Sequence, residues 1–197
     1  VDLHADLLRA SIASAGNDHR LGANEAPPAI ISIFLGDMLT DIIEQLETGK
    51  TRRTIKGGAL DLGAHTLPHI PRDSGDRNRT SPFAFTGSKF EFRAVGSSQN
   101  ISTPVTVINT IIAESLDFMA DRLRAAASTG GDFRKAALQV IAEVLKESRP
   151  IRFEGNYYDP EWVKEAKRRG LPNIASTCEA LGAFTKESNI RLFESCG

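Results

Sequence analysis

One stretch of this sequence says most about the fold: it runs from Phe83 to Arg93 and reads FAFTGSKFEFR. Two short runs of alternating residues flank Gly87-Ser88, and glycine in the first central position suits a two-residue type II′ turn. In that register Phe85 pairs with Phe90, and all four phenylalanines share one face because side chains alternate along a strand. A slip of one residue would break this aromatic face. The pattern therefore predicts a β-hairpin with one defined register.

The other face of the predicted hairpin is charged. It carries three side chains of the second strand: Lys89, Glu91 and Arg93. A carboxylate there can hold a divalent cation, and a guanidinium can bind an anionic substrate group with two parallel hydrogen bonds. The alternative is a solvated strand face with a cross-strand ion pair, and surface pairs of this kind are common and weak. The spacing alone leaves both interpretations open.

Two polar loops carry further candidate residues. Arg77 and Arg79 lie just upstream of the hairpin, where an arginine suits stabilisation of a transferring phosphoryl group. The turn from Asp18 to Pro28 contains His19 and Glu25, which are candidate acid–base groups. Each loop also has a plainer interpretation, as a soluble mixed-charge loop or an ordinary helix connection. The sequence has no Walker or GxGxxG glycine motif, which argues against a P-loop or Rossmann nucleotide site.

Helical periodicity dominates the rest of the chain. Apolar spacing, prolines in first turns and glycines after last turns predict helices over residues 3–15, 27–49, 104–127, 133–146 and 160–169, with one or two more between 174 and 193. Asp159 before Pro160 is a predicted helix N-cap. Residues 50–78 lack periodicity, and loops of this length inside compact domains are often functional.

Composition and charge limit which classes of function and which partners are expected for this chain. The chain has 197 residues, is 41% hydrophobic and has a formal net charge of −1, so no overall field draws it to nucleic acid or to a membrane surface. Its longest apolar run, Ala29 to Leu35, is much shorter than the roughly 20 residues that span a bilayer. Two cysteines, Cys178 and Cys196, are too few for a disulfide framework or a cysteine zinc site. These features predict a reduced, cytoplasmic protein with no nucleic-acid and no membrane partner.

Three motifs together resemble the long, type III class of glutamine synthetases. They are HRLGANEAPPA (19–29), DRNRTSPFAFTGSKFEFR (76–93) and VGSSQN (95–100). Their order and spacing also fit this family, and the resemblance covers nearly the whole chain. It implies an α+β fold in which helices pack on an antiparallel sheet. Residues 1–130 would be the C-terminal part of the catalytic domain, and residues 131–197 a helical C-terminal extension.

The resemblance implies how glutamate and ammonia are bound. Arg20 matches the arginine that binds the carboxylate of the glutamate substrate, and Arg93 matches a second arginine on the substrate and phosphoryl side. Glu25 matches the glutamate of a flap that closes over the site and helps to take a proton from ammonium.

It also implies how phosphate and metal are held. Arg79 matches an arginine that contacts the nucleotide phosphates and the transferred phosphoryl group. Glu91 matches a carboxylate ligand of the metal between the ATP phosphates. Lys89 stands where shorter classes often have an arginine that contacts ATP, and Ala84 stands where they have another phosphate-facing arginine.

The implied activity is ATP-dependent formation of glutamine from glutamate and ammonia through γ-glutamyl phosphate. The implied cofactors are ATP and Mg²⁺ or Mn²⁺, and the implied assembly is a ring-based homo-oligomer, a dodecamer. The family's other metal carboxylates, its metal histidine and its ammonium-site aspartate have no match in this sequence, which starts at Val1 rather than Met. We therefore expect a partial enzyme that is inactive as an isolated chain. Two alternatives stay open: a non-catalytic synthetase-like structural or regulatory oligomer, and a related carboxylate–amine ligase.

Overall fold

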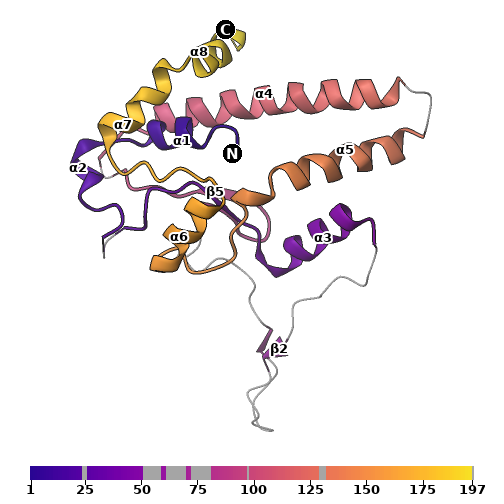
Figure 1. The fold of residues 1–197 in the computed structure, drawn as a ribbon, viewed down its shortest axis with the longest axis horizontal. Coiled ribbons are helices and arrows are strands. Elements are labelled where there is room, and N and C mark those ends of the chain that lie inside the picture. The colour runs from indigo at the N-terminus through magenta and orange to yellow at the C-terminus, as the bar shows by residue number, and fades with distance from the viewer. Residues whose placement is uncertain are drawn as a thin grey trace.

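The computed structural model describes residues 1–23, 26–50, 59–60, 70–71, 81–96, 98–128 and 132–196. Its helices (Figure 1) are α1 (Ala5–Ser11), α2 (Ala15–Asp18), α3 (Gly36–Thr48), α4 (Ser102–Ala127), α5 (Phe133–Glu147), α6 (Pro160–Arg168), α7 (Thr177–Leu181) and α8 (Glu187–Ser195). Two short 3-10 helices are η1 (Arg149–Ile151) and η2 (Gly182–Thr185). The strands are β1 (Ile33–Phe34), β2 (Ala59–Leu60), β3 (Ile70–Pro71), β4 (Phe83–Phe85) and β5 (Phe90–Phe92).

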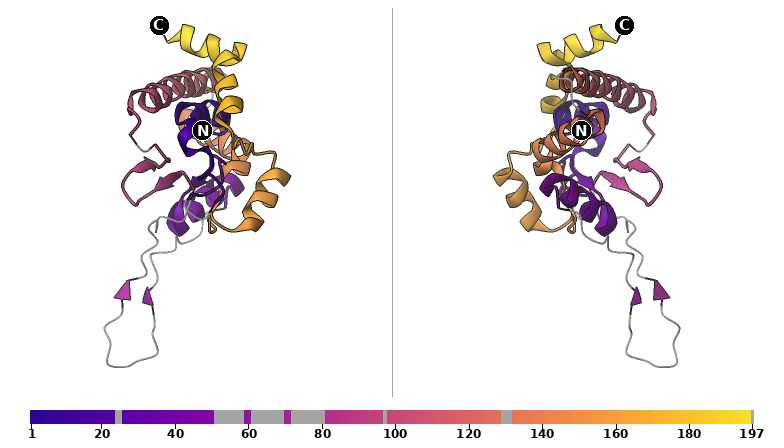
Figure 2. Two further views of the ribbon diagram at one scale, coloured as in Figure 1. Left: turned by 90° about the vertical axis from the view of Figure 1, so that its left-hand side faces the viewer. Right: turned by 90° about the vertical axis from the view of Figure 1, so that its right-hand side faces the viewer.

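The main sheet is small and mixed. β4 lies between the other two strands, parallel to β1 and antiparallel to β5, while β2 and β3 form a separate antiparallel pair. The hairpin of β4 and β5 has the predicted register: Phe83 pairs with Phe92, Ala84 with Glu91 and Phe85 with Phe90. Gly87 has a φ of 94°, and the predicted turn requires a positive φ at this position. Figure 2 shows the hairpin and α6 on opposite sides of α1. The α+β class is confirmed, but the main sheet is not purely antiparallel, because β1 adds a parallel strand.

The predicted helix over residues 27–49 is wrong in its first part. α3 begins only at Gly36, whereas residues 29–35 contain β1 and no helix. The apolar run that suggested a helical face is an almost entirely buried extended segment. The carboxylate of Glu154 accepts hydrogen bonds from the amides of Leu35 and Gly36, both at 2.9 Å, and so binds the unpaired donors where α3 begins. Local periodicity could not reveal such a distant partner.

The other helices follow the predicted ranges more closely. The helix predicted over 3–15 is too long, because α1 ends at Ser11 and α2 shares only Ala15 with that range. α4 starts slightly before the predicted residue 104, and α5 extends slightly beyond 146. The predicted N-cap is confirmed, since Asp159 accepts the amide of Glu161 at 2.9 Å. The C-terminal range holds α7 and α8.

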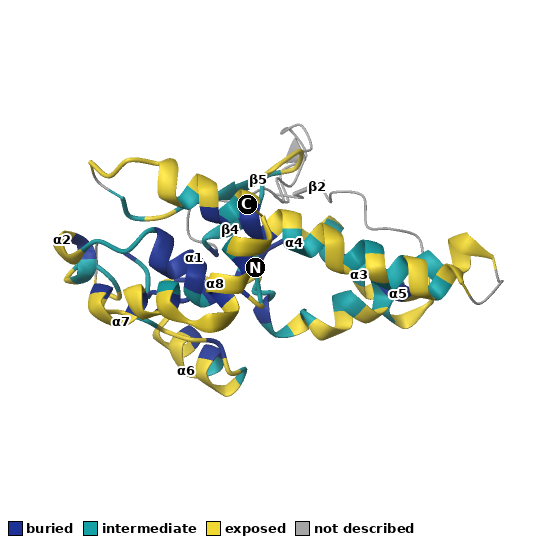
Figure 3. Ribbon diagram, turned by 90° about the horizontal axis from the view of Figure 1, so that it is seen from above, coloured by how far each residue is buried: buried dark blue, intermediate teal, exposed yellow. Residues whose placement is uncertain are grey.

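Helices α3, α4 and α5 project to one side as an arm. α5 packs against both α3 and α4, and Figure 3 shows the arm as mainly exposed or half-buried. The apolar side chains of α4 are only partly covered: Val105, Ile112 and Leu116 are exposed, whereas Val107 and Ile111 are buried. In the described part of the chain, no helix is long and apolar enough to cross a membrane.

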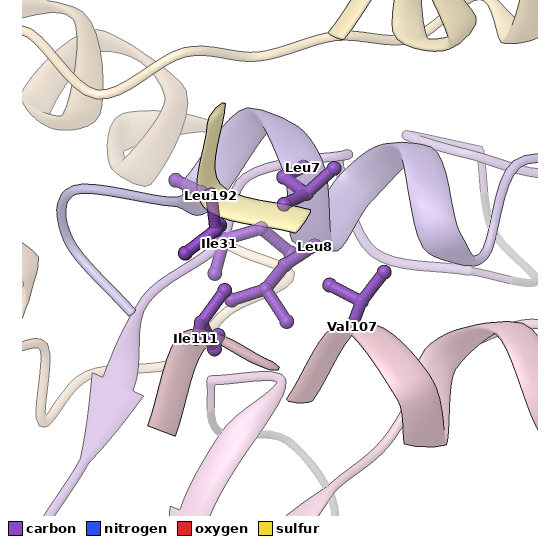
Figure 4. Close-up of a cluster of buried hydrophobic side chains, with 7 residues drawn as sticks. Leu7, Leu8, Ile31, Val107, Ile111 and Leu192 are labelled. Carbon is purple, nitrogen blue, oxygen red and sulfur yellow. The ribbon is translucent and has the colours of Figure 1, made fainter. Parts of the chain in front are cut away.

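Two clusters of buried apolar side chains hold the elements together. The first (Figure 4) joins α1, α4 and α8 through Ala5, Leu7, Leu8, Ile31, Val107, Ile111 and Leu192. The second joins the strand segment to the C-terminal helices through Ile30, Ile151, Tyr157, Trp162, Ala166 and Leu171. Both clusters contain residues from before and after residue 130, so the predicted extension packs directly on the preceding segment. The domain division itself stays a prediction.

Candidate functional site

Glu91 is the centre of the charged face predicted for β5. Arg93 donates from Nε and Nη2 to Oε2 of Glu91, at 3.0 and 2.8 Å, and Nζ of Lys89 lies 3.1 Å from Oε1. The side chains of Glu91 and Arg93 are 34% and 31% exposed. The ion pairs run along one strand rather than across the hairpin, because residues two apart on a strand point the same way. We call Lys89, Glu91 and Arg93 the β5 charged cluster.

The loop that carries Arg20 closes tightly on itself. The amide of Gly22 donates to the carbonyl of Pro27 at 3.1 Å, and Gly22 has a φ of 76°, a region that favours glycine. Nη1 of Arg20 donates to Oδ1 of Asn17 at 3.3 Å. Asn17 in turn donates from Nδ2 to the carbonyl of Val95 at 3.3 Å. Asn17 therefore links the side chain of Arg20 to the backbone just after the β5 charged cluster.

A cavity of about 210 Å³ lies between this loop and the hairpin. Its wall includes Arg93 from the charged cluster and Leu21, Pro27 and Pro28 from the loop. Tyr157 also lines it, and burial raises the pKa of the Tyr157 phenol, so this side chain is a neutral part of the wall. The fold thus brings Arg93 to the same cavity as the sequence neighbours of Arg20.

The predicted site residues fall into two groups. Arg20, Lys89, Glu91 and Arg93 lie in the described residues, whereas Glu25 and Arg79 lie outside them. Within the described ranges, no three His, Cys, Asp or Glu side chains are grouped so that they could hold a metal ion. The described part of the site is therefore rich in cations and offers Glu91 as one carboxylate for a metal.

The sequence did not reveal the contacts of Asp18, at the start of the loop that carries Arg20. The Asp18 carboxylate accepts hydrogen bonds from the amide and the Oγ1 of Thr177, both at 2.7 Å, and from Nη2 of Arg9 at 3.5 Å. Burial alone would raise the pKa of Asp18, but the hydrogen bonds from Thr177 and the charge and hydrogen bond of Arg9 lower it below its ordinary value. Thr177 is 159 residues from Asp18, so no local pattern could reveal their contact. The one signal in the sequence was an arginine at position 9 within an apolar helix pattern.

Comparisons with known proteins show which family the sequence resembles. Residues 136–197 match the glutamine synthetase C-terminal domain family. The chain is 50% identical over 194 residues, 98% of its length, to the type-3 glutamine synthetase of Dictyostelium discoideum. It is 48% identical over 189 residues, 94% of its length, to the glutamine synthetase of Bacteroides fragilis (strain YCH46), and 36% identical over 207 residues, along its whole length, to that of Butyrivibrio fibrisolvens.

These alignments cover 26%, 26% and 28% of the three relatives, so the chain spans about a quarter of their length. The resemblance to type III glutamine synthetases that the three motifs predicted is confirmed by these relatives and by the match of residues 136–197 to the C-terminal domain family.

Proposed function

We propose that this chain, with its glutamine synthetase C-terminal domain, supplies the substrate- and phosphate-binding part of a glutamate–ammonia ligase. The reaction is ATP-dependent formation of glutamine through γ-glutamyl phosphate. Similarity to three glutamine synthetases along nearly the whole chain supports this proposal. We further propose that the complete enzyme is cytoplasmic and works as a ring-based homo-oligomer.

One observation carries the proposal: Arg93 lies at a cavity that it shares with the loop of Arg20. Its guanidinium is held by Glu91, which fixes the planar group in one orientation at the cavity wall. Two arginines on neighbouring segments suit an amino-acid substrate with two carboxylates, because each guanidinium can bind a carboxylate with two hydrogen bonds. Arg20 and Arg93 are the proposed glutamate-binding residues.

The proposed phosphate side of the site comprises Lys89, Glu91 and Arg79. Lys89 and Arg79 would contact ATP phosphates, and a bound Mg²⁺ or Mn²⁺ would offset the negative charge that develops on the phosphoryl oxygens. Glu91 fits as one metal ligand, because its Oε1 is paired with a 67%-exposed lysine, in an ion pair that solvent weakens. Within the described residues it belongs to no group of three His, Cys, Asp or Glu side chains that could hold the ion. Glu25 is proposed as the flap residue that takes a proton from ammonium.

The experiment uses a full-length synthetase in which this chain replaces the 194 aligned residues of the Dictyostelium relative. Arg93→Lys keeps the charge but loses the paired hydrogen bonds, so the KM for glutamate should rise about 10- to 100-fold. The matched control is Arg191→Lys, at an arginine 73% exposed on α8, which should leave KM unchanged. An unchanged KM in the Arg93 variant would contradict the proposal.

The isolated chain is expected to form no glutamine from glutamate, ammonia and ATP with magnesium. The physical reason is that the described residues contain no group of three His, Cys, Asp or Glu side chains that could hold a metal ion. Glutamine turnover by the isolated chain would overturn the statement that it supplies only part of the active site.

A further inference from the structure

The loop that carries Arg20 is attached to the C-terminal domain at its start. Asp18 precedes Arg20 by two positions, and its carboxylate accepts both the amide and the hydroxyl of Thr177. Thr177 is the first residue of α7, where a helix leaves amides without a partner inside the helix. The bond therefore satisfies a donor of α7 and fixes the entrance of the loop at the same time.

The same loop is attached to the same C-terminal segment at its end. The amide of Ile174 donates to the carbonyl of Ala29 at 3.3 Å, and Ile30 forms an antiparallel bridge with Asn173. Ile30 is fully buried, in the cluster that contains Trp162. The exit of the loop is thus held by backbone hydrogen bonding and by apolar packing together.

Arg9 joins these two attachments. Its side chain is only 3% exposed, and it donates from Nε to the carbonyl of Ile174 at 2.8 Å and from Nη2 to that of Ala175 at 3.2 Å. The same Nη2 donates to Asp18. A buried guanidinium is stable only with such acceptors around it, so Arg9 fixes the C-terminal segment relative to the loop entrance. In Figure 1, α2, which ends at Asp18, and α7 lie side by side, in agreement with their contacts.

We infer that residues 173–177 are a clamp that sets the distance between the two ends of the loop 18–30, with Thr177 as a positioning residue for Arg20. That Arg20 serves glutamate rests on the proposed function, whereas the clamp itself rests on the contacts alone. Between the clamped ends, the bond from Gly22 to Pro27 closes the neck of the loop. Through this clamp the C-terminal segment acts on the reaction by positioning Arg20.

The clamp is tested on the 197-residue chain by amide hydrogen exchange. Thr177→Val removes the hydroxyl donor while keeping the shape of the side chain, and the amides of Gly22 and Ile174 should then exchange about tenfold faster. Thr177→Ser keeps the hydroxyl and should restore slow exchange. The matched control is Thr185→Val, because the hydroxyl of Thr185 donates only to Gly182 in its own turn, at 2.9 Å.

Three outcomes would overturn the clamp. The first is unchanged exchange of Gly22 and Ile174 in Thr177→Val. The second is equally fast exchange in α5, which would make Thr177 a general stability residue rather than a clamp. The third is failure of Thr177→Ser to restore protection.

A second readout links the clamp to catalysis in the full-length synthetase that carries this chain. A loosened loop admits water to the acyl phosphate, so Thr177→Val should increase the ATP hydrolysed per glutamine formed, while Thr185→Val should not. Faster exchange with an unchanged ratio would overturn the role of the clamp in positioning the catalytic loop but leave the proposed function standing. If the unsubstituted synthetase formed no glutamine while Thr177→Val still exchanged faster, the proposed function would be contradicted. The clamp itself would remain supported.

Discussion

Asp18 and Thr177 are joined by two hydrogen bonds of 2.7 Å, although 159 residues separate them in the chain. Both bonds are stronger to the ionised carboxylate than to the neutral acid, and they lie in a region where Arg9 adds a positive charge. The relationship connects the first part of the chain to its C-terminal part through one titratable group, and so it predicts a dependence on pH.

The pKa of Asp18 lies below its ordinary value of 3.8, since hydrogen bonds from Thr177 and the charge of Arg9 outweigh the effect of burial. A lowered carboxyl pKa contributes stability that is fully present above the unfolded value and is lost as the pH falls through the folded value. The contact should therefore be constant through neutral pH and weaken only below about pH 3.8. The amide chemical shift of Thr177, followed by NMR during acid titration, measures the midpoint of the Asp18 titration. Asp18→Asn should abolish the titration; a midpoint above 3.8 would contradict the prediction.

Leu8 tests the first buried cluster. It is fully buried on α1 against residues of α4 and α8, so Leu8→Ala should lower the free energy of unfolding by about 2–5 kcal/mol. The matched control is Leu3→Ala, at a leucine 74% exposed, which should change it by less than about 0.5 kcal/mol. Denaturant unfolding of both variants measures the difference. Similar losses at the two positions would contradict the assigned core.

Two glycines should respond in opposite directions to the same substitution. Gly87 has a φ of 94° and open space around an added Cβ, so Gly87→Ala should destabilise the hairpin by about 1–2 kcal/mol through backbone strain alone. Gly182 has right-handed angles, φ −56° and ψ −22°, and equally open space. Gly182→Ala should therefore stabilise the chain by about 0.4–1 kcal/mol by restricting the unfolded state. Thermal unfolding checks both, and a stabilising Gly87→Ala would show that the turn is assigned wrongly.

The hairpin could be predicted from sequence because everything that fixes it is local. The alternation of four phenylalanines and the turn at Gly87 lie within eleven residues, and Phe83 stacks on Phe92 with ring centroids 4.7 Å apart. The side-chain direction of Glu91 and Arg93 followed from the same alternation. Their mutual contact and the shared cavity needed the structure.

The start of α3 and the loop clamp could not be predicted because their partners are distant. Residues 29–35 fit a helical apolar face as well as a buried strand, and periodicity does not distinguish the two for a short run. The packing of Ile30 on the C-terminal helices and the carboxylate of Glu154 at Gly36 favour the strand and set the start of α3. The roles of Glu25 and Arg79 came from the resemblance and stay predictions.

We propose that the β5 charged cluster belongs to a catalytic site and is not only a surface ion pair. Glutamine formation by the full-length synthetase carrying this chain tests it most directly, with Glu91→Gln compared with Glu194→Gln, at a glutamate exposed near the end of α8. Loss of the carboxylate should reduce kcat about a hundredfold or more and raise the magnesium concentration needed for half-maximal rate, whereas the control should match the unsubstituted enzyme. A Glu91→Gln enzyme with an unchanged rate and an unchanged magnesium requirement would contradict the claim.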